Sequence, residues 1–264
     1  MTGIQRYIIC AFAIGLLLFA TSCDDGGPTD ESPAADSASA AEEITQADQL
    51  YGQRGDLMQL RRGIVALRQA LTNDPGNYDA AWKLSKFNYY LATHTDDTKE
   101  RDQAFKDGID AGKTAVQLQN GKPDGHFWLG ANYGGAAEHS TIQGLATVDD
   151  IRNEMETVLR LDQGYQNGSA YMVLGLVYLN APAIVGGDPK KAVEEMEKGL
   201  PFGEPNAFLH LHLAEAYKKV GRNNDARREL KKILDMTPDP NYQPEYKEAS
   251  TDAQKLLDQI DHAG

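Results

Sequence analysis

The residues with the clearest potential for chemistry in this chain are its two cysteines, Cys10 and Cys23. Cys23 directly follows Ala20, Thr21 and Ser22, which close an apolar run. Small residues before a cysteine suit a signal peptidase, so this pattern predicts that the Cys23 thiol receives a diacylglycerol through a thioether. The alternative is a plain signal peptide with an incidental cysteine. If Cys10 leaves with the leader and Cys23 carries lipid, no thiol remains for a disulfide or a metal site.

The histidines do not form a recognisable catalytic or metal-binding pattern. His210 and His212 are two positions apart on a predicted helix, so their side chains should point to different faces. His139 lies between Glu138 and Ser140, but adjacent residues seldom face one another as a serine–histidine–acid site requires. The chain also lacks a zinc-protease helix motif, a phosphate loop and a nucleophile elbow. We therefore expect a protein that binds other molecules, with no catalytic site, no metal and no cofactor.

A recurring set of mostly apolar and aromatic residues predicts a binding groove. Its members take equivalent positions in successive repeats, and Asn180 stands beside the last of them. The set is Trp82, Lys86, Tyr89, Phe127, Ala131, Met172, Leu176, Leu179, Asn180 and Leu211. A continuous apolar concavity usually binds a ligand or a partner. The alternative is that two inserted segments, 134–148 and 181–187, cover these residues, and both interpretations hold if the insertions close the groove into a pocket.

The groove residues depend on a sequence pattern that recurs along the chain. Each copy has a Leu, a small residue and, three positions later, a Tyr or Asn. The copies are Leu84-Ser85 with Asn88, Leu129-Gly130 with Tyr133, Leu174-Gly175 with Tyr178, and Leu213-Ala214 with Tyr217. The last copy continues at the offsets of a helix–turn–helix unit of about 34 residues. The pattern predicts an all-α, tetratricopeptide-like solenoid with inserted loops and a C-terminal capping helix.

The predicted units are punctuated by proline, glycine and capping residues. The first unit spans 44–75, and the second begins near Tyr78 and has a long second helix over 98–119. The third begins near Asp124, contains the first insertion and ends with a helix over 149–161. The fourth contains the second insertion, after which Asp188 is a suitable N-cap and Pro189 a suitable first helical residue. The fifth spans 207–238, and a capping helix over 245–260 follows.

The beginning of the chain differs in composition from the repeats. Residues 1–22 are predicted to be a lipoprotein signal peptide, because the apolar run over 7–19 is shorter than the roughly 20 residues that span a bilayer. Residues 23–43 are predicted to be the lipidated cysteine and a disordered acidic linker without large apolar residues. The helical domain then occupies 44–264. Asp24, directly after the cysteine, resembles the signal that keeps enteric lipoproteins in the inner membrane.

The charge of the chain restricts its partners. Its 264 residues carry a formal net charge of −13 at pH 7. Nucleic acid binding requires a basic face, so this balance argues against it. The same balance disfavours electrostatic attachment to an anionic lipid surface.

Several consecutive segments resemble one known family. They are the run from Gly125 to Tyr133, the helix-like stretch 151–161, the run from Gly168 to Gly175, and Ala181-Pro182 before the stretch 186–192. Their order resembles the TatT family, the tetratricopeptide lipoproteins associated with TRAP transporters, over roughly residues 47–240. The insertion with Pro182 is the most specific part of the match.

The resemblance implies a function that the residues by themselves do not establish. It implies a periplasm-facing, lipid-anchored helical protein that partners a TRAP substrate-binding protein in solute uptake. It also implies a trimer that passes ligand through an apolar cavity. The alternative function is a generic adaptor or scaffold in cell-envelope assembly, for example of outer-membrane proteins or pili.

Overall fold

The structure is a computed structural model that describes residues 33–139 and 141–262. The predicted signal peptide, Cys10, Cys23 and Asp24 lie outside the described residues. From Pro33 onward the chain forms one compact unit. Within the described ranges the secondary structure is helical, with no strand.

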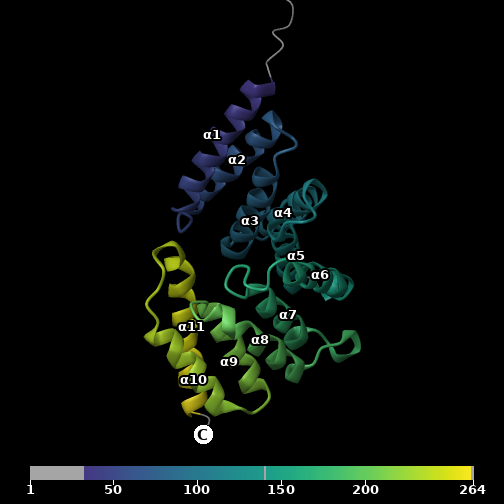
Figure 1. The fold of residues 1–264 in the computed structure, drawn as a ribbon. Helices are drawn as coiled ribbons and strands as arrows, with labels where there is room; N and C mark the ends of the chain where they lie inside the picture. Colours follow the sequence, from purple (N-terminus) through teal and green to yellow (C-terminus); the bar gives the residue numbers. More distant parts are fainter. Residues whose placement is uncertain (1–32, 140, 263–264) are drawn as a thin grey trace, which may run out of the picture. The chain divides into compact units, whose positions relative to one another are not determined.

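The helices follow one another in pairs, with a single helix at the end (Figure 1). The pairs are α1 (Pro33–Tyr51) with α2 (Leu57–Asn73), α3 (Tyr78–His94) with α4 (Thr98–Leu118), α5 (Pro123–Glu138) with α6 (Thr141–Leu161), α7 (Ser169–Asn180) with α8 (Pro189–Gly203), and α9 (Ala207–Lys219) with α10 (Asn223–Asp235). The last helix is α11 (Gln243–His262), and short 3-10 turns are η1 (Ala183–Val185) and η2 (Pro240–Tyr242). The paired arrangement confirms the predicted tetratricopeptide-like solenoid and its capping helix.

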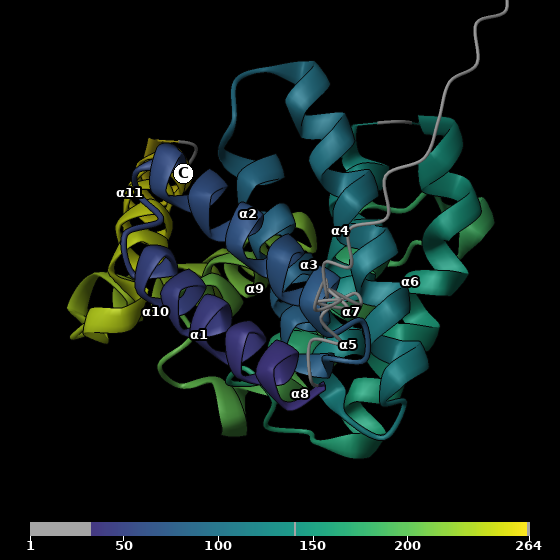
Figure 2. The same ribbon diagram turned by 90° about the horizontal axis from the view of Figure 1, so that it is seen from above.

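Contacts between pairs show which helices form the inner side of the solenoid. Each helix packs on its partner and on the next helix in the chain. In addition, the first helices of neighbouring pairs contact one another, from α1 to α3, α3 to α5, α5 to α7 and α7 to α9. Figure 2 gives a second view of this packing. The first helices therefore line one continuous surface, as the groove prediction requires.

Local sequence signals start most of these helices. The side chains of Asp56, Asn77, Asp97 and Asn206 accept hydrogen bonds from backbone N–H groups of the helices that follow them. Asp188 does the same for Lys190 and Lys191, with Pro189 at the first helical position. Such caps satisfy amide groups that have no partner inside the helix. The predicted cap at Asp188 is confirmed.

Two glycines of the repeated pattern allow close helix packing. A Cβ atom on Gly130 would lie 2.4 Å from Met155 Cε, and one on Gly175 would lie 2.4 Å from Met196 Cγ. Met155 and Met196 are fully buried. The glycines therefore let a methionine of the second helix pack directly on the backbone of the first.

Helix α1 begins at Pro33, inside the segment 23–43 for which the sequence predicts a disordered linker. The sequence from Pro33 is rich in alanine, the best helix former, and proline is well tolerated at a first helical position. Ala40 is fully buried. The side-chain amide nitrogen Nδ2 of Asn73, on α2, lies 3.1 Å from Ser39 Oγ and 3.4 Å from Glu43 Oε1. Packing on α2 thus orders the second half of the expected linker.

The first predicted insertion, 134–148, is mostly helical and is not a loop. It extends α5 to Glu138 and brings the start of α6 forward to Thr141. A Cβ atom on Gly135 would lie 2.3 Å from Phe105 Cε1, so this extension of α5 packs tightly on α4. The extension continues the helical packing along α4, which is itself longer than the repeat requires.

The second insertion, 181–187, is a compact turn held by α6. Arg152 on α6 donates to the Val185 carbonyl at 3.1 Å, and the turn contains η1. Gly186 has a φ of 92°, which disfavours other residues. A Cβ atom on Gly187 would lie 1.7 Å from the Ala181 carbonyl oxygen. The polar contacts of this insertion go to α6 and α7, whereas the prediction placed it over the groove.

Candidate functional site

The residues of the predicted groove divide between two hydrophobic clusters. Trp82, Tyr89, Phe127 and Ala131 belong to the cluster around α5 and α6. Met172, Leu176, Leu179 and Leu211 belong to the cluster around α9. We call the first group, together with Lys86 and the two rings beside it, Tyr51 and Trp128, the aromatic half of the surface, and the second group the aliphatic half. Asn180 is exposed at the end of α7.

Three of the predicted groove residues are core residues. Phe127, Ala131 and Leu211 expose 5%, 7% and 3% of their surface, respectively. Phe127 packs against Tyr165, with ring centroids 5.2 Å apart. Tyr165 lies in the turn between α6 and α7, outside both predicted insertions. Phe127, Ala131 and Leu211 therefore have the burial of packing positions, and residues outside the two insertions cover at least Phe127.

Tyr165 is held in place by Asp124, a residue that the sequence prediction did not use. The Tyr165 hydroxyl donates to Asp124 Oδ1 at 2.9 Å, and the Tyr78 hydroxyl donates to Asp124 Oδ2 at 3.3 Å. The Gly125 amide in turn donates to the Tyr78 oxygen at 3.1 Å. Burial raises the pKa of both tyrosines, and the charge of Asp124 adds to the effect. Both tyrosines therefore act as neutral donors that fix the start of α5.

Lys86 lies in the aromatic half, where its ammonium faces aromatic rings and where Glu245 and Asp48 act on its charge without a direct contact. Its ammonium lies 4.1 Å from the ring centroid of Tyr51 and 5.7 Å from that of Trp128. Among the described residues it forms no ion pair. Burial and then the positive charge of Arg54 lower the pKa of Lys86 to about 8. The side chain is thus a partly desolvated cation whose neighbours are aromatic faces.

Trp128 is a hydrogen-bond donor without an acceptor. It is 9% exposed, and its indole Nε1 is buried with no hydrogen-bond partner. Its ring lies 5.7 Å from the ring of Tyr89. By contrast, the indole of Trp82 donates to Asp79 Oδ1 at 3.0 Å. Buried indole N–H groups usually find an acceptor, so Trp128 is an exception that needs an explanation.

Arg54 joins the first repeat to the last helix of the unit. Its guanidinium donates to both carboxylate oxygens of Glu245, at 2.8 and 2.6 Å, and to the Asn241 carbonyl at 2.6 Å. It is 4% exposed and lies over the ring of Tyr51, 4.7 Å from the centroid. We call this set of contacts the Arg54 clasp. Its donors are satisfied, whereas the neighbouring Lys86 forms no direct ion pair within the described residues.

A second link to α11 runs through His94 at the end of α3. Its Nε2 lies 3.6 Å from Glu248 Oε2, and its ring stacks on Tyr90 with centroids 3.8 Å apart. Burial opposes the charged form, but bonds to Glu248 and to the Tyr90 carbonyl leave the pKa of His94 raised. The contacts that link α11 with the first two repeats are therefore largely ionic.

Two other histidines form matching structural links within repeats. His126 places Nδ1 2.5 Å from Glu154 Oε2 and Nε2 2.9 Å from the Asn120 carbonyl. His210 places Nδ1 2.6 Å from Glu229 Oε2 and Nε2 3.1 Å from the Glu204 carbonyl. Both ring nitrogens face acceptors in each case, and for His126 an imidazolium satisfies both partners. The hydrogen bond to Glu154 raises the pKa of His126, against the effect of burial.

The histidine that follows His210 by two positions has a separate partner. His212 contacts Glu215 at 2.8 Å on the same helix and is half-buried. His210 and His212 therefore do point to different faces, as their spacing predicts. In the described part of the chain, no group of three or more His, Cys, Asp and Glu side chains could hold a metal ion.

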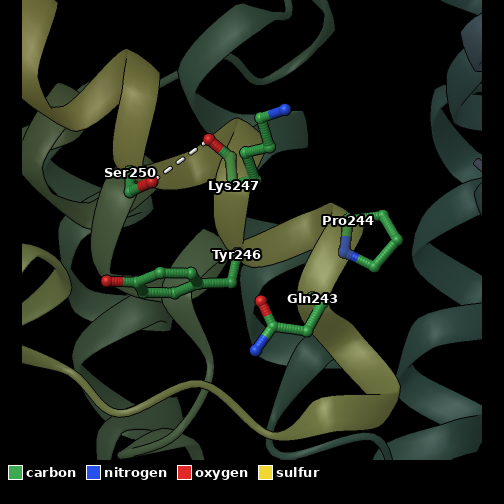
Figure 3. A pocket seen from close by; sticks show the side chains of 5 residues that line it. All are labelled: Gln243, Pro244, Tyr246, Lys247 and Ser250. Carbon is green, nitrogen blue, oxygen red and sulfur yellow. Dashed lines mark hydrogen bonds between the residues drawn. The ribbon is translucent and has the colours of Figure 1, made fainter.

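Two surface hollows lie away from the predicted groove residues. One, of about 480 Å³, is lined by Gln243, Pro244, Tyr246, Lys247 and Ser250. Figure 3 shows Gln243 and Tyr246 extending to one side of this segment and Pro244 to the other. The other hollow, of about 350 Å³, lies on one face of α1 and is lined by Ala41, Glu42, Thr45, Gln46 and Gln49. Each is lined by a single helix, so neither is a built ligand pocket.

The family of the chain follows from its match to the family model of the TRAP transporter T-component over residues 89–262. The chain belongs to this T-component family. No curated protein sequence matches it significantly. The family is that of a component associated with a TRAP transporter, which is a membrane transporter of the cell envelope. No helix within 33–139 or 141–262 has the length and apolar content to cross a membrane.

Solved structures support the fold of this T-component. TTC0263, a thermophilic TPR protein of Thermus thermophilus, has a TM-score of 0.59 and 20% identity, and the alignment covers 80% of this chain and 98% of that chain. PilF of Pseudomonas aeruginosa has a TM-score of 0.54 and 18% identity, with coverages of 85% and 93%. At these identities the likeness concerns the fold alone.

The aromatic half lies across the beginning of the T-component match. Tyr89 and Trp128 fall within the matched residues, whereas Tyr51, Trp82 and Lys86 precede them. The family match therefore includes only some of the residues around Lys86 and does not include Lys86 itself.

Proposed function

We propose that this T-component is a lipid-anchored, periplasm-facing binding accessory of a TRAP-type solute uptake system, where it partners the substrate-binding protein. The family match over residues 89–262 carries this proposal. The anchor in the proposal is Cys23, which lies outside the described residues. Through its linker the helical unit would remain at the membrane that holds the transporter.

The inner surface formed by the first helices supports a binding role. Its aromatic half keeps Trp82, Lys86 and Tyr89 partly accessible, and its aliphatic half keeps Met172, Leu176 and Leu179 partly accessible. Asn180 is exposed beside Leu179. Apolar and aromatic side chains that stay accessible are typical of surfaces that contact a ligand or a partner. The proposed oligomer is the trimer that the family resemblance implies.

Partner capture tests the proposed association. The full chain with a C-terminal tag would be solubilised in detergent from its native membrane and purified, and co-purifying proteins would be identified by mass spectrometry. We expect the TRAP substrate-binding protein in the eluate. Recovery of assembly factors for outer-membrane proteins or pili, without any TRAP component, would contradict the proposal and favour the adaptor function.

The anchor is tested separately by the substitution Cys23→Ser. Loss of the thiol removes the site of the thioether, so the protein should move from the membrane fraction to the soluble periplasmic fraction. Cys10→Ser is the matched control, because Cys10 would leave with the leader, and this variant should stay membrane-bound. Membrane association of Cys23→Ser equal to that of the unchanged chain would exclude lipidation at this residue.

A further inference from the structure

Residues 241–248, which we call the α11 strap, join the end of the chain to its first two repeats. Glu245 accepts two hydrogen bonds, of 2.8 and 2.6 Å, from the guanidinium of Arg54 in the first repeat. Three positions later, Glu248 lies 3.6 Å from His94 Nε2 in the second repeat. Residues three apart on a helix share one face, so the strap presents its two carboxylates together. Figure 1 shows the start of α11 near the turn between α1 and α2.

Apolar packing holds the rest of α11 to the last repeats and does not extend to the first ones. The hydrophobic cluster that contains Ala249, Ala253 and Ile260 of α11 otherwise contains only residues from Met172 onward. Within the part of the chain that the structure describes, the cluster of the first two repeats contains no residue of α11. Repeats of a solenoid normally contact only their neighbours, and this contact between distant repeats is ionic. The strap can therefore separate from the first repeats without exposing their apolar core.

Beneath the strap, the first two repeats form a surface of cations and aromatic rings. Arg54 lies 4.7 Å and the Lys86 ammonium 4.1 Å from the ring centroid of Tyr51. The His94 ring stacks on Tyr90 with centroids 3.8 Å apart. Burial and the nearby strap carboxylates raise the pKa of Tyr90 to about 12. We call these five residues the basic surface, a local exception in a chain with a net charge of −13.

Release of the strap requires a replacement for its carboxylates. Arg54 is 4% exposed, and a buried cation that loses its partner strongly destabilises a fold. A planar guanidinium is best satisfied by a carboxylate that accepts two parallel hydrogen bonds. A displacing segment must therefore bring carboxylates of its own, with the spacing that Glu245 and Glu248 have on a helix. These requirements describe an acidic helical segment of a protein.

We propose that the basic surface is a docking site for an acidic helical segment of a partner protein, and that the α11 strap occupies this site in the unbound chain. The strap acts as a competitor within the same molecule, so the partner segment binds by displacing Glu245 from Arg54 and Glu248 from His94. The seated strap shows which chemistry the site accepts. This inference rests on the proposed binding function and deepens it, because it names the surface and the kind of segment that docks there.

Peptide titration of the detergent-purified full chain tests the proposal. The probe is a fluorescent peptide that copies residues 239–255, and its control has glutamine in place of both strap glutamates. The chain would be compared with a strap variant, Glu245→Gln with Glu248→Gln, by fluorescence anisotropy. We expect the strap variant to bind the acidic peptide at least tenfold more tightly than the unchanged chain does, and at least tenfold more tightly than it binds the control peptide. Equal affinity in either comparison, or no binding to the strap variant, would overturn the proposal.

A matched variant shows whether the position of the lost charges matters. Asp252→Asn with Asp258→Asn also removes two carboxylates from α11, but beyond the strap, where Asp252 pairs with Lys255 on the same helix. This variant should bind the acidic peptide as weakly as the unchanged chain does. Tightening equal to that of the strap variant would show that the net charge of α11 governs binding, and would contradict competition by the strap.

Substitution of Arg54 in the strap variant assigns the binding to the basic surface. Arg54→Met should remove the gain in peptide affinity, and Arg54→Lys, which keeps the charge without the paired hydrogen bonds, should keep part of it. Arg61→Met is the control, because Arg61 pairs with Glu100 at the surface and should leave the gain intact. A gain that persists in a folded Arg54→Met protein, checked by circular dichroism, would overturn the assignment.

Hydrogen exchange tests the displacement in the unchanged chain and requires no variant. Saturating acidic peptide should speed the exchange of the backbone amides in 243–248 several-fold, while those in 253–260, which pack on the last repeats, stay as they are. Unchanged exchange in 243–248 at saturation would contradict displacement.

Capture of the TRAP substrate-binding protein separates this inference from the proposed function. The strap variant should recover several-fold more of that partner than the unchanged chain does. If the peptide results hold and that partner is never recovered, the proposed function fails while the docking site stands. If the peptide results fail, the docking site is excluded whatever the capture shows.

Discussion

The aromatic and aliphatic halves of the inner surface occupy equivalent repeat positions but have different surroundings. In the aliphatic half, Met172, Leu176 and Leu179 pack on the α9 cluster, which also includes residues of α11. In the aromatic half, the Lys86 ammonium faces aromatic rings and the buried Trp128 Nε1 has no hydrogen-bond partner. The capping helix covers one end of the solenoid with apolar contacts, and it reaches the first repeats through Arg54 and His94.

The difference shows that a position in a repeat does not fix the role of its side chain. Leu211 and Trp82 share one offset, yet Leu211 is buried and Trp82 is partly accessible. The deciding factor is which neighbouring element covers the position. Leu211 therefore contributes mainly to stability, whereas Trp82 at the same offset stays available for contacts with a partner.

The largest expected effect comes from a charge in the aliphatic half. Leu211→Asp would bury an unpaired carboxylate, at a cost of several kcal/mol or more. We expect the variant to be largely unfolded by circular dichroism and to lose the urea transition. Trp82→Asp, at the same offset in the aromatic half, should unfold much less. Equal destabilisation of the two variants would remove the distinction between the halves.

The next largest effect should come from the Arg54 clasp. Arg54→Met breaks a buried ion pair, for which about 3–5 kcal/mol is typical, but Glu245 is 24% exposed and can turn toward water. We therefore expect a loss of about 2 kcal/mol in the free energy of unfolding, with partial recovery when Glu245→Gln is added. Arg61→Met is the control, since its pair with Glu100 is at the surface and should contribute about 0–1 kcal/mol. A loss no larger than that of the control would show that the clasp adds little stability.

A smaller effect concerns pH and the His126 link. The pKa of His126 is raised in the folded chain, so its bond to Glu154 stabilises the protein fully below the unfolded pKa, which is near 6.5. This stabilisation is lost as pH rises through the folded pKa. Melting temperatures from pH 6 to pH 9 should therefore fall more for the unchanged chain than for His126→Gln. Parallel curves for the two proteins would contradict a charged His126.

The smallest effect should occur in the second insertion, which belongs to neither half. Ile184 is 91% exposed at the tip of the turn that Arg152 holds. Ile184→Ser should change the free energy of unfolding by no more than about 0.5 kcal/mol, as is usual for exposed positions. Chemical denaturation measures this, and a larger loss would show that the insertion packs on other parts of the chain more closely than its contacts indicate.

The sequence by itself determined the repeat, the order of the helices and most of their boundaries. Those features are encoded locally. The pattern of Leu129, Gly130 and Tyr133 recurs in other repeats with the same helical spacing. Asp188 and Pro189 start α8 through contacts with residues that follow them directly in the sequence. The groove prediction also brought together residues that do lie on the first helices. It did not identify which of them are core, because burial depends on neighbours distant in sequence, such as Tyr165 over Phe127.

Only the tertiary structure decided the parts of the molecule that join distant segments. The first insertion became helical because α5 could extend along α4 and pack Gly135 on Phe105. Arg54 found its partner Glu245 across 191 positions, which no local pattern encodes. The same packing left the Trp128 indole Nε1 without an acceptor. Helical periodicity is a short-range property that can be read directly from the sequence. Whether a charge or a hydrogen-bond donor finds a partner depends instead on residues that are close only in three dimensions.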